Sequence, residues 1–539
     1  MRFSLFLLYL LAVVNSLVLP LDFAAGRAAS HESAVQSQPG FLQLIKEWIA
    51  IFSTREVASA IPRGSFESWL QEQEKISFES ILQNIGGYGE FAQNVSIGAV
   101  IASPSQTRPN YFYQWTRDSA LTVMSLVEYL DDHELQDYEF GLCGLVESYI
   151  ENQYHVQRLA NPSGTFEDLT GLGEPKFMAN GEAFVDHWGR PQRDGPGLRV
   201  ITVLGYLSLL TKYEGNFQHE FFTSHDDSFR FVYDEIVKPD LQYIVHHWAS
   251  PGFDLWEEVN SLHLFTSLTQ LKALKLGMTY ALAYSDSEFY AVLTTAYNAL
   301  NFFIQVDSGY KTGNLPFLIE TPTLLLTGKR IGLDIASILA SLRAHDVDDV
   351  GDALDIPFAV DDPVVLNTLT AMVNDMKYRY PINHNRLGFG TGFALGRYPE
   401  DVYDGYGTTE GNPWFIATAS ASELVYKILY KLYKYENDLY IPIGLREFYQ
   451  PFFEFEIKQD MVVPFGSDEF HMVADGLIKY ADSFMDVIRE HVDNNGHMSE
   501  QFNKYSGFME GAEDLTWSYS SCWSSMRWRN KVVKLMERS

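Results

Sequence analysis

The chain has 539 residues, of which 46% are hydrophobic, 14% are aromatic and 20% are charged, with a formal net charge of −31. This hydrophobic fraction excludes a disordered chain, and the lack of a long apolar run after the N-terminus excludes a polytopic membrane protein. A charge of −31 would repel a phosphate backbone, so we expect no nucleic-acid partner. A neutral ligand is more compatible with this negative charge than a polyanion is.

The N-terminus has the pattern of a signal peptide. Arg2 precedes an apolar run over residues 3–14, and Ser16 is a small residue at the expected cleavage position. The run is too short for a comfortable membrane span, and a buried helix is the alternative. We therefore expect residues 1–16 to be removed, no membrane span in the mature chain, and entry into the secretory pathway, with secretion or a vacuole as the destination.

Two further observations bear on this route. Asn94-Val95-Ser96 is a sequon for N-glycosylation, which is consistent with secretion. Cys143 and Cys522 could form one disulfide, but a core of this size does not need it, and we expect no bond.

Residues 17–60 form an N-terminal extension of unknown role, and a catalytic-size domain is expected over residues 61–539.

The rest of the chain repeats the apolar periodicity of helices. Few alternating strand patterns compete, and no low-complexity linker divides the chain after residue 60. The pattern therefore predicts one large all-α domain with about a dozen helices. The expected helices span residues 119–130, 136–159, 197–213, 228–248, 266–283, 287–303, 333–344, 363–375, 414–433, 472–492 and 515–536.

The loops between these helices hold most of the unusual residues. Polar groups stand beside Trp or Tyr in residues 111–118, 188–196, 254–258 and 396–401, and a glycine-containing turn spans residues 171–175. If these loops meet at one end of a helical barrel, they line a pocket with flat hydrophobic walls and a few fixed polar groups. Such a pocket suits a small polar ligand.

Two carboxylate-bearing segments beside aromatic residues point to hydrolysis of a glycosidic bond. Glu257 and Glu258 follow Trp256, and Glu500 lies far downstream. The reaction needs one carboxylic acid to protonate the leaving oxygen and one carboxylate on the opposite side. Repulsion between the adjacent glutamates, beside Trp256, predicts a raised pKa for one of them, which could then act as the acid. The alternative is two exposed glutamates at a helix start, and Glu500 by itself would usually be a surface residue.

Arg117 and Asp118 place a bidentate donor beside an acceptor, which suits adjacent sugar hydroxyls. An internal ion pair is an equally good interpretation of these neighbours. The histidines lack the spacing of metal ligands, and neither a phosphate loop nor a nucleophile elbow is present. We therefore expect no metal and no cofactor.

Six motifs occur in one order along the chain. They are residues 111–118, Trp-Gly-Arg-Pro-Gln at 188–192, Asp-Leu-Trp-Glu-Glu at 254–258, Gly-Arg-Tyr-Pro-Glu-Asp at 396–401, Gly-Asn-Pro-Trp-Phe at 411–415 and Ser-Glu-Gln at 499–501. Through them the chain resembles the glucoamylases of glycoside hydrolase family 15, the yeast branch in particular, over about residues 66–534. The resemblance implies an (α/α)6 barrel, in which six outer helices surround six inner helices and the pocket lies at one end.

The resemblance also implies the catalytic roles. Glu257 corresponds to the general acid and Glu500 to the general base that activates water, so that hydrolysis inverts the anomeric configuration. Their carboxyl groups should then lie ~6.5–9.5 Å apart. Asp254 corresponds to a position sometimes described as the proton acceptor, and we rank it second, as a support for the loop of the acid.

For the substrate, the resemblance implies starch, glycogen and maltooligosaccharides, from which a monomeric enzyme removes α-1,4-linked glucose at non-reducing ends, and α-1,6-linked glucose more slowly. Arg117, Asp118 and Arg397 correspond to the polar grip on the terminal glucose. The other implied substrate-binding residues are Tyr111, Trp115, Trp188, Arg190, Trp256, Glu258, Asp401, Trp414 and Trp517.

Two alternatives remain open at this stage. Another α-glucoside specificity, such as that of a trehalase or glucodextranase, would share the grip on terminal glucose, and loop residues near Trp188 should discriminate between them. A carbohydrate-binding barrel without catalysis is the second, although the presence of both Glu257 and Glu500 argues against it. No starch-binding module is expected after Lys534, so strong adsorption to raw granules is not expected from this chain.

Overall fold

The computed structural model of the protein describes residues 65–135, 140–213, 225–349, 351, 355–388 and 390–538. The expected signal peptide, residues 1–16, and the expected extension, residues 17–60, lie outside these ranges. Within them the chain is mainly helical, as the periodicity predicts.

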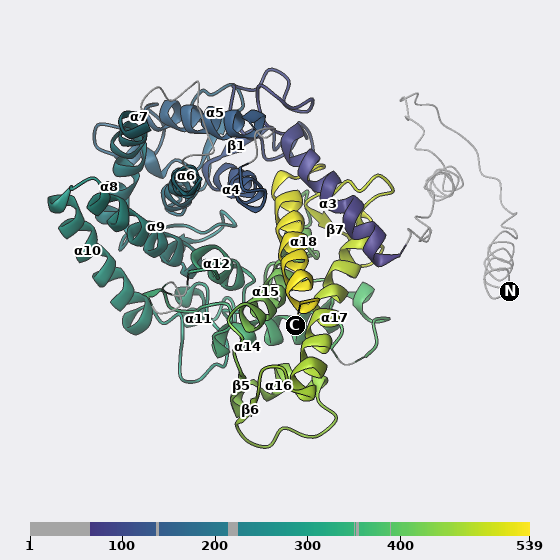
Figure 1. Cartoon of the computed structure of the whole chain (residues 1–539). Helices are drawn as coiled ribbons and strands as arrows, with labels where there is room; N and C mark the ends of the chain where they lie inside the picture. The colour runs from purple at the N-terminus through teal and green to yellow at the C-terminus, as the bar shows by residue number, and fades with distance from the viewer. Residues whose placement is uncertain are drawn as a thin grey trace, which may run out of the picture. The chain divides into compact units, whose positions relative to one another are not determined.

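Six helices of the described chain form a closed inner ring (Figure 1). Each packs against the next one along the chain, and the last, α18, packs against the first, α4. The ring consists of α4 (Thr116–Asp132), α6 (Gly195–Lys212), α9 (Leu264–Ala283), α12 (Ala336–Ala344), α15 (Phe415–Lys434) and α18 (Thr516–Met536).

A second layer of helices covers the ring. α3 packs against α18, α5 against α4, α8 against α6, α10 against α9, α14 against α12 and α17 against α15. These outer helices are α3 (Phe66–Gln83), α5 (Phe140–Gln157), α8 (Lys238–His247), α10 (Ser287–Phe302), α14 (Pro363–Arg379) and α17 (Asp468–His491). Alternation of inner and outer helices around a closed ring is the (α/α)6 barrel that the resemblance implies, and that prediction is confirmed.

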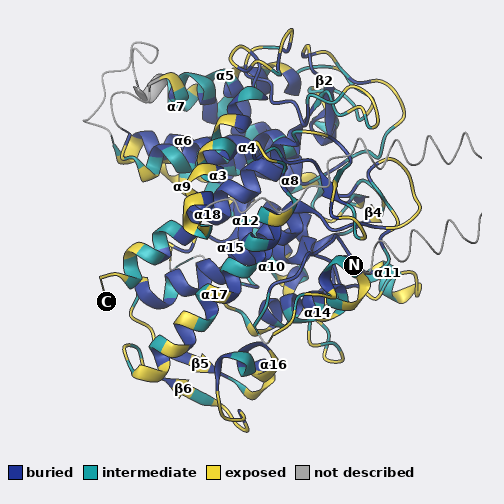
Figure 2. Ribbon diagram, turned by 90° about the vertical axis from the view of Figure 1, so that its right-hand side faces the viewer, coloured by how far each residue is buried: buried dark blue, intermediate teal, exposed yellow. Residues whose placement is uncertain are grey.

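The two layers have the sequence patterns that their positions require. The inner helix α15 is buried on nearly all sides and is built from small, aliphatic and aromatic residues. The outer helix α17 has one apolar stripe that includes Val473, Leu477 and Phe484, and the Ser467 hydroxyl caps its first turn by accepting the amide of Phe470. In Figure 2 the interior of the barrel is accordingly dark blue, while exposed residues lie at the periphery.

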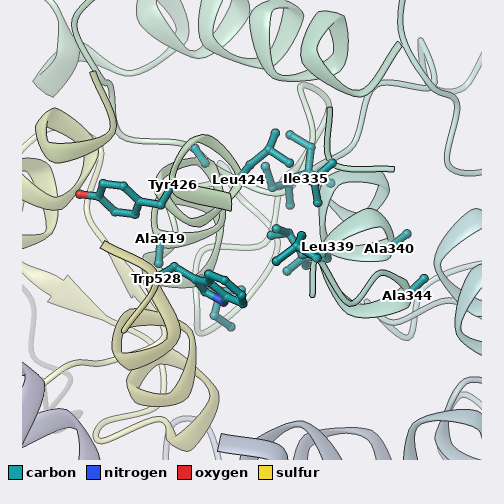
Figure 3. Packing of buried hydrophobic residues seen from close by; sticks show 14 of the residues in the cluster. Ile335, Leu339, Ala340, Ala344, Ala419, Leu424, Tyr426 and Trp528 are labelled. Atoms are coloured by element: carbon teal, nitrogen blue, oxygen red, sulfur yellow. The ribbon is translucent and has the colours of Figure 1, made fainter. Parts of the chain in front are cut away.

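The core between α12, α15 and α18 is filled by close packing of large and small side chains (Figure 3). Leu339 of α12, Leu424 of α15 and Trp528 of α18 belong to the same buried cluster. Ala419 on α15 and Ala340 on α12 are completely buried. Small residues at such positions let helices approach closely, so that larger neighbours can interdigitate.

One expected helix differs in the structure. Residues 228–248 are divided into α7 (His225–Val232), a π-helical turn (Tyr233–Val237) and α8. Pro239 has no amide hydrogen to donate to the carbonyl of Glu235, which is why a regular helix is disfavoured here. That carbonyl instead accepts a hydrogen bond from the guanidinium of Arg158 at 3.0 Å. α3 is absent from the expected set, because its polar residues obscure the apolar stripe.

The described strands are short and form antiparallel pairs. β1 (Tyr113–Trp115) pairs with β2 (Lys176–Met178), β3 (Gly252–Phe253) with β4 (Asn260–Ser261), β5 (Leu439–Ile441) with β6 (Met461–Val463), and β7 (Gln501–Phe502) with β8 (Met509–Glu510). Three of these pairs flank loops that carry predicted site residues. They fix the loops at the end of the barrel where the inner helices begin.

Two expectations about the whole chain can be compared with the described part. Cys143 and Cys522 are both buried and are not bonded to each other. None of the described helices combines the length and the apolar character needed to cross a bilayer.

A buried ion pair joins the two helical layers. Arg199 of α6 donates to both carboxylate oxygens of Asp240 on α8, each at 2.7 Å, and also to Gln153 at 3.0 Å. Both side chains are at most 2% exposed. Burial raises the pKa of Asp240, and the Arg199 cation opposes that shift.

We predict that Asp240→Asn lowers the free energy of unfolding by about 3–5 kcal/mol, because it leaves the Arg199 cation buried without a counter-charge. Urea denaturation would measure the change. Lys212→Met is the control, since Lys212 pairs with Asp131 at the surface and such pairs contribute about 0–1 kcal/mol. Equal effects of the two substitutions would contradict the role given to the buried pair.

Candidate active site

The candidate site lies at the end of the barrel where inner helices begin. Trp115 directly precedes α4, Trp414 precedes α15 and Leu515 precedes α18. A cavity of about 180 Å³ opens between these segments and the loop that joins β3 to β4. Cavities of about 640 and about 610 Å³ lie elsewhere on the described chain. The smaller cavity is the one that gathers the predicted residues.

Most of the predicted site residues line this cavity. They are Tyr111, Trp115, Arg117, Asp118, Trp188, Trp256, Glu257, Glu258, Arg397, Trp414, Glu500 and Trp517. Segments far apart in the sequence therefore meet here, as the loop pattern led us to expect. Aromatic rings make up much of the wall, and carboxylates and guanidinium groups interrupt it.

Three predicted residues do not line the cavity. Arg190 points to Glu174, with 3.1 Å between Nε and Oε1, and also donates to the carbonyl of Asp186 at 2.8 Å. Asp401 binds Arg397, and Asp254 supports the loop of Glu257. Each of the three binds a neighbouring residue and is absent from the cavity lining, which argues against direct sugar contact for Arg190.

Glu257 is held in a fixed orientation by donors to one of its oxygens. Its Oε1 atom accepts hydrogen bonds from Trp115 Nε1 at 2.6 Å and from Gln192 Nε2 at 2.8 Å. The guanidinium of Arg117 lies 3.8 Å from the same oxygen. The φ angle of Glu257 is +65°, a left-handed conformation that is uncommon for residues other than glycine and is often found at functional sites.

Asp254 builds the turn that imposes this conformation. Its Oδ1 atom accepts the backbone amides of Glu258 and Val259, each at 2.7 Å, and its carbonyl accepts the amide of Glu257 at 2.9 Å. The side chain of Asp254 is buried, and the structure gives it the contacts of a loop support. The two glutamates therefore lie in the loop between β3 and β4, and the alternative of a helix start is excluded.

Glu258 points to a different set of partners. It accepts hydrogen bonds from Arg397 at 2.9 Å, from Arg330 at 2.6 Å and from the hydroxyl of Tyr398. Burial raises the pKa of Glu258, but the Arg397 cation and these hydrogen bonds outweigh it, so the net shift is downward. The sequence predicts a raised pKa for one of the two adjacent glutamates, and Glu258 is not that one, because it binds two arginines that are distant in sequence. Arg397 is itself fixed by a bidentate pair with Asp401, at 2.6 and 2.8 Å.

The Arg117–Asp118 neighbours form an ion pair and also line the cavity, so the two interpretations hold together. Arg117 Nε lies 3.3 Å from Asp118 Oδ2, and Arg117 also reaches Asp194 at 3.2 Å and Gln192 at 2.8 Å. Burial raises the pKa of Asp118 to about 6, although the Arg117 cation lowers it. Asp194 and Gln192, which do not line the cavity, thus hold Arg117 in place beside Asp118.

Glu500 is 2% exposed, unlike a surface glutamate. Burial raises its pKa to about 8, while the Arg397 cation and hydrogen bonds from Tyr111 and Tyr403 act in the opposite direction. The hydroxyls of these two tyrosines are 3.0 Å apart. Gly511 packs against the carboxylate so closely that a Cβ atom there would lie 2.5 Å from Glu500 Oε2, and its φ of +79° also favours glycine.

Sequence reasoning missed several residues of this wall. Tyr403, Ala102, Ile416 and Leu515 line the cavity without having been singled out, and Tyr403 lies only two residues beyond the Gly396–Asp401 motif. Lys176 is also buried here, with its Nζ atom 3.4 Å from the ring centroid of Trp188 and 4.6 Å from that of Trp115. Burial lowers the pKa of Lys176 to about 8, and the charge of Glu257 opposes that shift.

Several buried polar atoms of the lining residues make no hydrogen bond within the described protein. They are Arg117 Nε, Asp118 Oδ2, Trp188 Nε1 and Trp414 Nε1. Arg117 Nε and Asp118 Oδ2 are ion-paired with each other at 3.3 Å, whereas the two indole N–H groups are left as donors to the hydroxyl groups of a ligand. Among the described residues, no group of three His, Cys, Asp or Glu side chains is placed to hold a metal ion.

The geometry agrees with comparisons to known proteins. The model of the glycosyl hydrolases family 15 matches residues 75–525. A glucoamylase of Saccharomycopsis fibuligera is 38% identical over 496 residues, which cover 88% of this chain and 92% of that protein. The intracellular sporulation-specific glucoamylase of Saccharomyces cerevisiae is 37% identical over 544 residues, covering 97% of this chain and 95% of that protein.

The fold comparison gives the same answer. A solved glucoamylase structure from Saccharomycopsis fibuligera has a TM-score of 0.82 at 38% identity, covering 88% of this chain and 97% of that chain. A family 15 glucoamylase structure from Hypocrea jecorina has a TM-score of 0.77 at 32% identity, and the match covers 87% of this chain and 73% of that chain. With its barrel, its cavity and its matched motifs, the chain belongs to the glycosyl hydrolases family 15.

Proposed function

We propose that the protein is a glucoamylase, which removes single glucose units from the non-reducing ends of starch, glycogen and maltooligosaccharides and releases β-D-glucose. It acts on α-1,4 linkages and, more slowly, on α-1,6 linkages. The observation that carries the proposal is one cavity lined by both Glu257 and Glu500. At about 180 Å³ it is smaller than the roughly 300–1,000 Å³ of sites for drug-sized ligands, which suits one sugar ring at a chain end.

Glu257 is the proposed general acid. Both hydrogen bonds to this carboxyl group end on Oε1, so Oε2 can carry the proton that is given to the glycosidic oxygen. As the C1–O bond breaks, the leaving glucan takes this proton and departs as a neutral alcohol. Positive charge develops at C1 and the ring oxygen at the same time.

Glu500 is the proposed general base. It accepts a proton from a water molecule, whose oxygen bonds to C1 on the face opposite the leaving group, and this inverts the configuration. A separation of ~6.5–9.5 Å between the two carboxyl groups remains the prediction for this mechanism. Burial raises the pKa of Glu500 to about 8, and the Arg397 cation and the hydroxyls of Tyr111 and Tyr403 limit that rise, so they favour the ionised form that a base requires against the effect of burial.

The proposed grip on the terminal glucose uses Arg117, Asp118 and Arg397. Asp118 offers carboxylate oxygens, one of which is ion-paired with Arg117 Nε at 3.3 Å, and Trp188 and Trp414 offer indole N–H donors without a hydrogen-bond partner in the described protein. Both arginines are held by carboxylates on their far side, namely Asp194 and Asp401. Donors that are fixed before the substrate arrives lose less entropy when they bind it.

The destination of the protein is also a proposal. We propose that residues 1–16 act as a signal peptide and that the protein functions as a secreted monomer, with a vacuole as the alternative. Asn94 is exposed, which supports its use as a glycosylation site. The intracellular relative in Saccharomyces cerevisiae favours the internal alternative. A mobility shift after enzymatic removal of N-glycans would test the secretory route, and an unshifted band would count against it.

The substrate class is tested by measuring glucose release from maltose, soluble starch and trehalose. We predict release from maltose and from starch, because the proposed grip holds the terminal glucose and leaves the rest of the chain outside. Hydrolysis of trehalose alone would replace this specificity with that of a trehalase. Binding of maltooligosaccharides without any release of glucose would instead favour a non-catalytic barrel.

Replacing each carboxylate separates the two proposed roles. Glu257→Gln should lower kcat on maltose by about 10²-fold or more, because the leaving oxygen is no longer protonated. The same variant should keep far more activity on α-glucosyl fluoride, since fluoride leaves without a proton. Glu500→Gln should lose activity on both substrates, and the exposed Glu447→Gln should behave as wild type. If Glu500→Gln kept its activity on α-glucosyl fluoride and Glu257→Gln lost it, Glu500 would be the acid and Glu257 the base.

Tyr403→Phe should move the acid limb of kcat/KM to higher pH. A general base must be ionised, so activity is lost as the pH falls through the pKa of Glu500 in the free enzyme. The Tyr403 hydroxyl lowers that pKa, so its removal raises it, by roughly one unit for a hydrogen bond to a charged group. The exposed Tyr440→Phe is the control. An unmoved limb, or a shift to lower pH, would contradict the assignment of Glu500 as the base.

A further inference from the structure

Two turns meet at the rim of the cavity. One spans residues 105–111 and the other residues 403–408. Each contributes one tyrosine to the cavity wall, Tyr111 and Tyr403, and the hydroxyls of these residues are 3.0 Å apart. The two turns are therefore joined at the level of the pocket.

Both turns are braced by internal hydrogen bonds. In the first, the Ser105 hydroxyl donates to the carbonyl of Pro109 at 2.8 Å, and the amide of Tyr111 donates to the carbonyl of Ser105 at 2.9 Å. In the second, Asp404 Oδ1 accepts the amides of Tyr406 and Gly407 at 2.9 and 2.6 Å. Residues at the tips of these turns are thus presented by a backbone that is already ordered.

The tips carry a second contact between the same turns. The guanidinium carbon of Arg108 lies 5.3 Å from the ring centroid of Tyr406. Arg108 is exposed, and Tyr406 is 50% exposed. Within the described chain, neither side chain makes a hydrogen bond or an ion pair, so their polar groups remain available to a ligand. This exposed pair lies on the same two turns as the Tyr111–Tyr403 pair that lines the cavity.

We propose that Arg108 and Tyr406 form an outer saccharide-binding site, which holds glucose units of an α-glucan that remain outside the pocket. The proposal rests on the proposed function. The Tyr406 ring offers an apolar face to the C–H groups of a pyranose, and the Arg108 guanidinium offers several N–H donors to its hydroxyls. A neutral oligosaccharide is not repelled by a chain with a net charge of −31.

The outer site makes binding depend on chain length. Maltose has two glucose units and ends close to the pocket, whereas maltoheptaose extends beyond its rim. Contacts with distant units are the same before and in the transition state, so they lower KM and leave kcat unchanged. A comparison of KM for maltose with KM for maltoheptaose therefore distinguishes the effect of this outer site from that of the catalytic pocket.

Tyr406→Ala should raise KM for maltoheptaose roughly 3- to 10-fold, as expected for the loss of an aromatic stacking contact. Its kcat on maltoheptaose, and both constants on maltose, should match wild type. Tyr440→Ala is the matched control, because Tyr440 is 57% exposed and lies on β5. Arg108→Met should raise KM for maltoheptaose in the same direction. An unchanged KM for maltoheptaose, or an equal rise for maltose, would overturn the outer site.

A binding measurement keeps this test independent of catalysis. Isothermal titration of maltoheptaose into Glu257→Gln and into Glu257→Gln/Tyr406→Ala should give a Kd that is roughly 3- to 10-fold higher for the double variant. If the wild-type protein hydrolyses neither maltose nor maltoheptaose, the proposed function fails, but a higher Kd still supports the outer site. Equal Kd values overturn the outer site, whether or not the wild-type protein is active.

Discussion

The turn that Asp254 holds decides how the two adjacent glutamates are used. One carboxylate oxygen of Asp254 accepts two successive amides, at 2.7 Å each, and the turn places Glu257 at a φ of +65°. Glu257 then meets the indole of Trp115, while Glu258 meets the guanidinium groups of Arg330 and Arg397. The buried side chain of Asp254 thus gives the two adjacent glutamates different surroundings. Glu257 becomes the proposed proton donor, and Glu258 becomes an anion fixed by two arginines.

Arg397 connects this turn to the other side of the pocket. It binds Glu258 and Asp401, and its charge lowers the pKa of Glu500 against the effect of burial. Inner helices also begin around the cavity, and the partial positive charge at a helix N-terminus favours nearby carboxylates. A protein with a net charge of −31 can therefore gather several carboxylates in one small cavity.

The helices could be predicted because apolar periodicity is a local signal, and most of the cavity wall could be predicted because the motifs carry the resemblance to a known family. The failures have physical causes that are not local. Arg190 belongs to a matched motif, yet it pairs with Glu174 and is not among the residues that line the cavity. Lys176 and Tyr403 were missed because their positions depend on rings and strands from other segments. The lowered pKa of Glu258 likewise depends on two arginines distant in sequence.

The central claim is that Glu257 and Glu500 act on opposite faces of one sugar ring. Proton NMR of freshly released glucose measures this most directly, because the anomer formed first records the face from which water attacks. Soluble starch digested at high enzyme concentration should give β-glucose before mutarotation sets in, because nearly all glucose released early comes from non-reducing ends. Initial release of α-glucose would show retention, and would contradict an acid and a base separated by a water molecule.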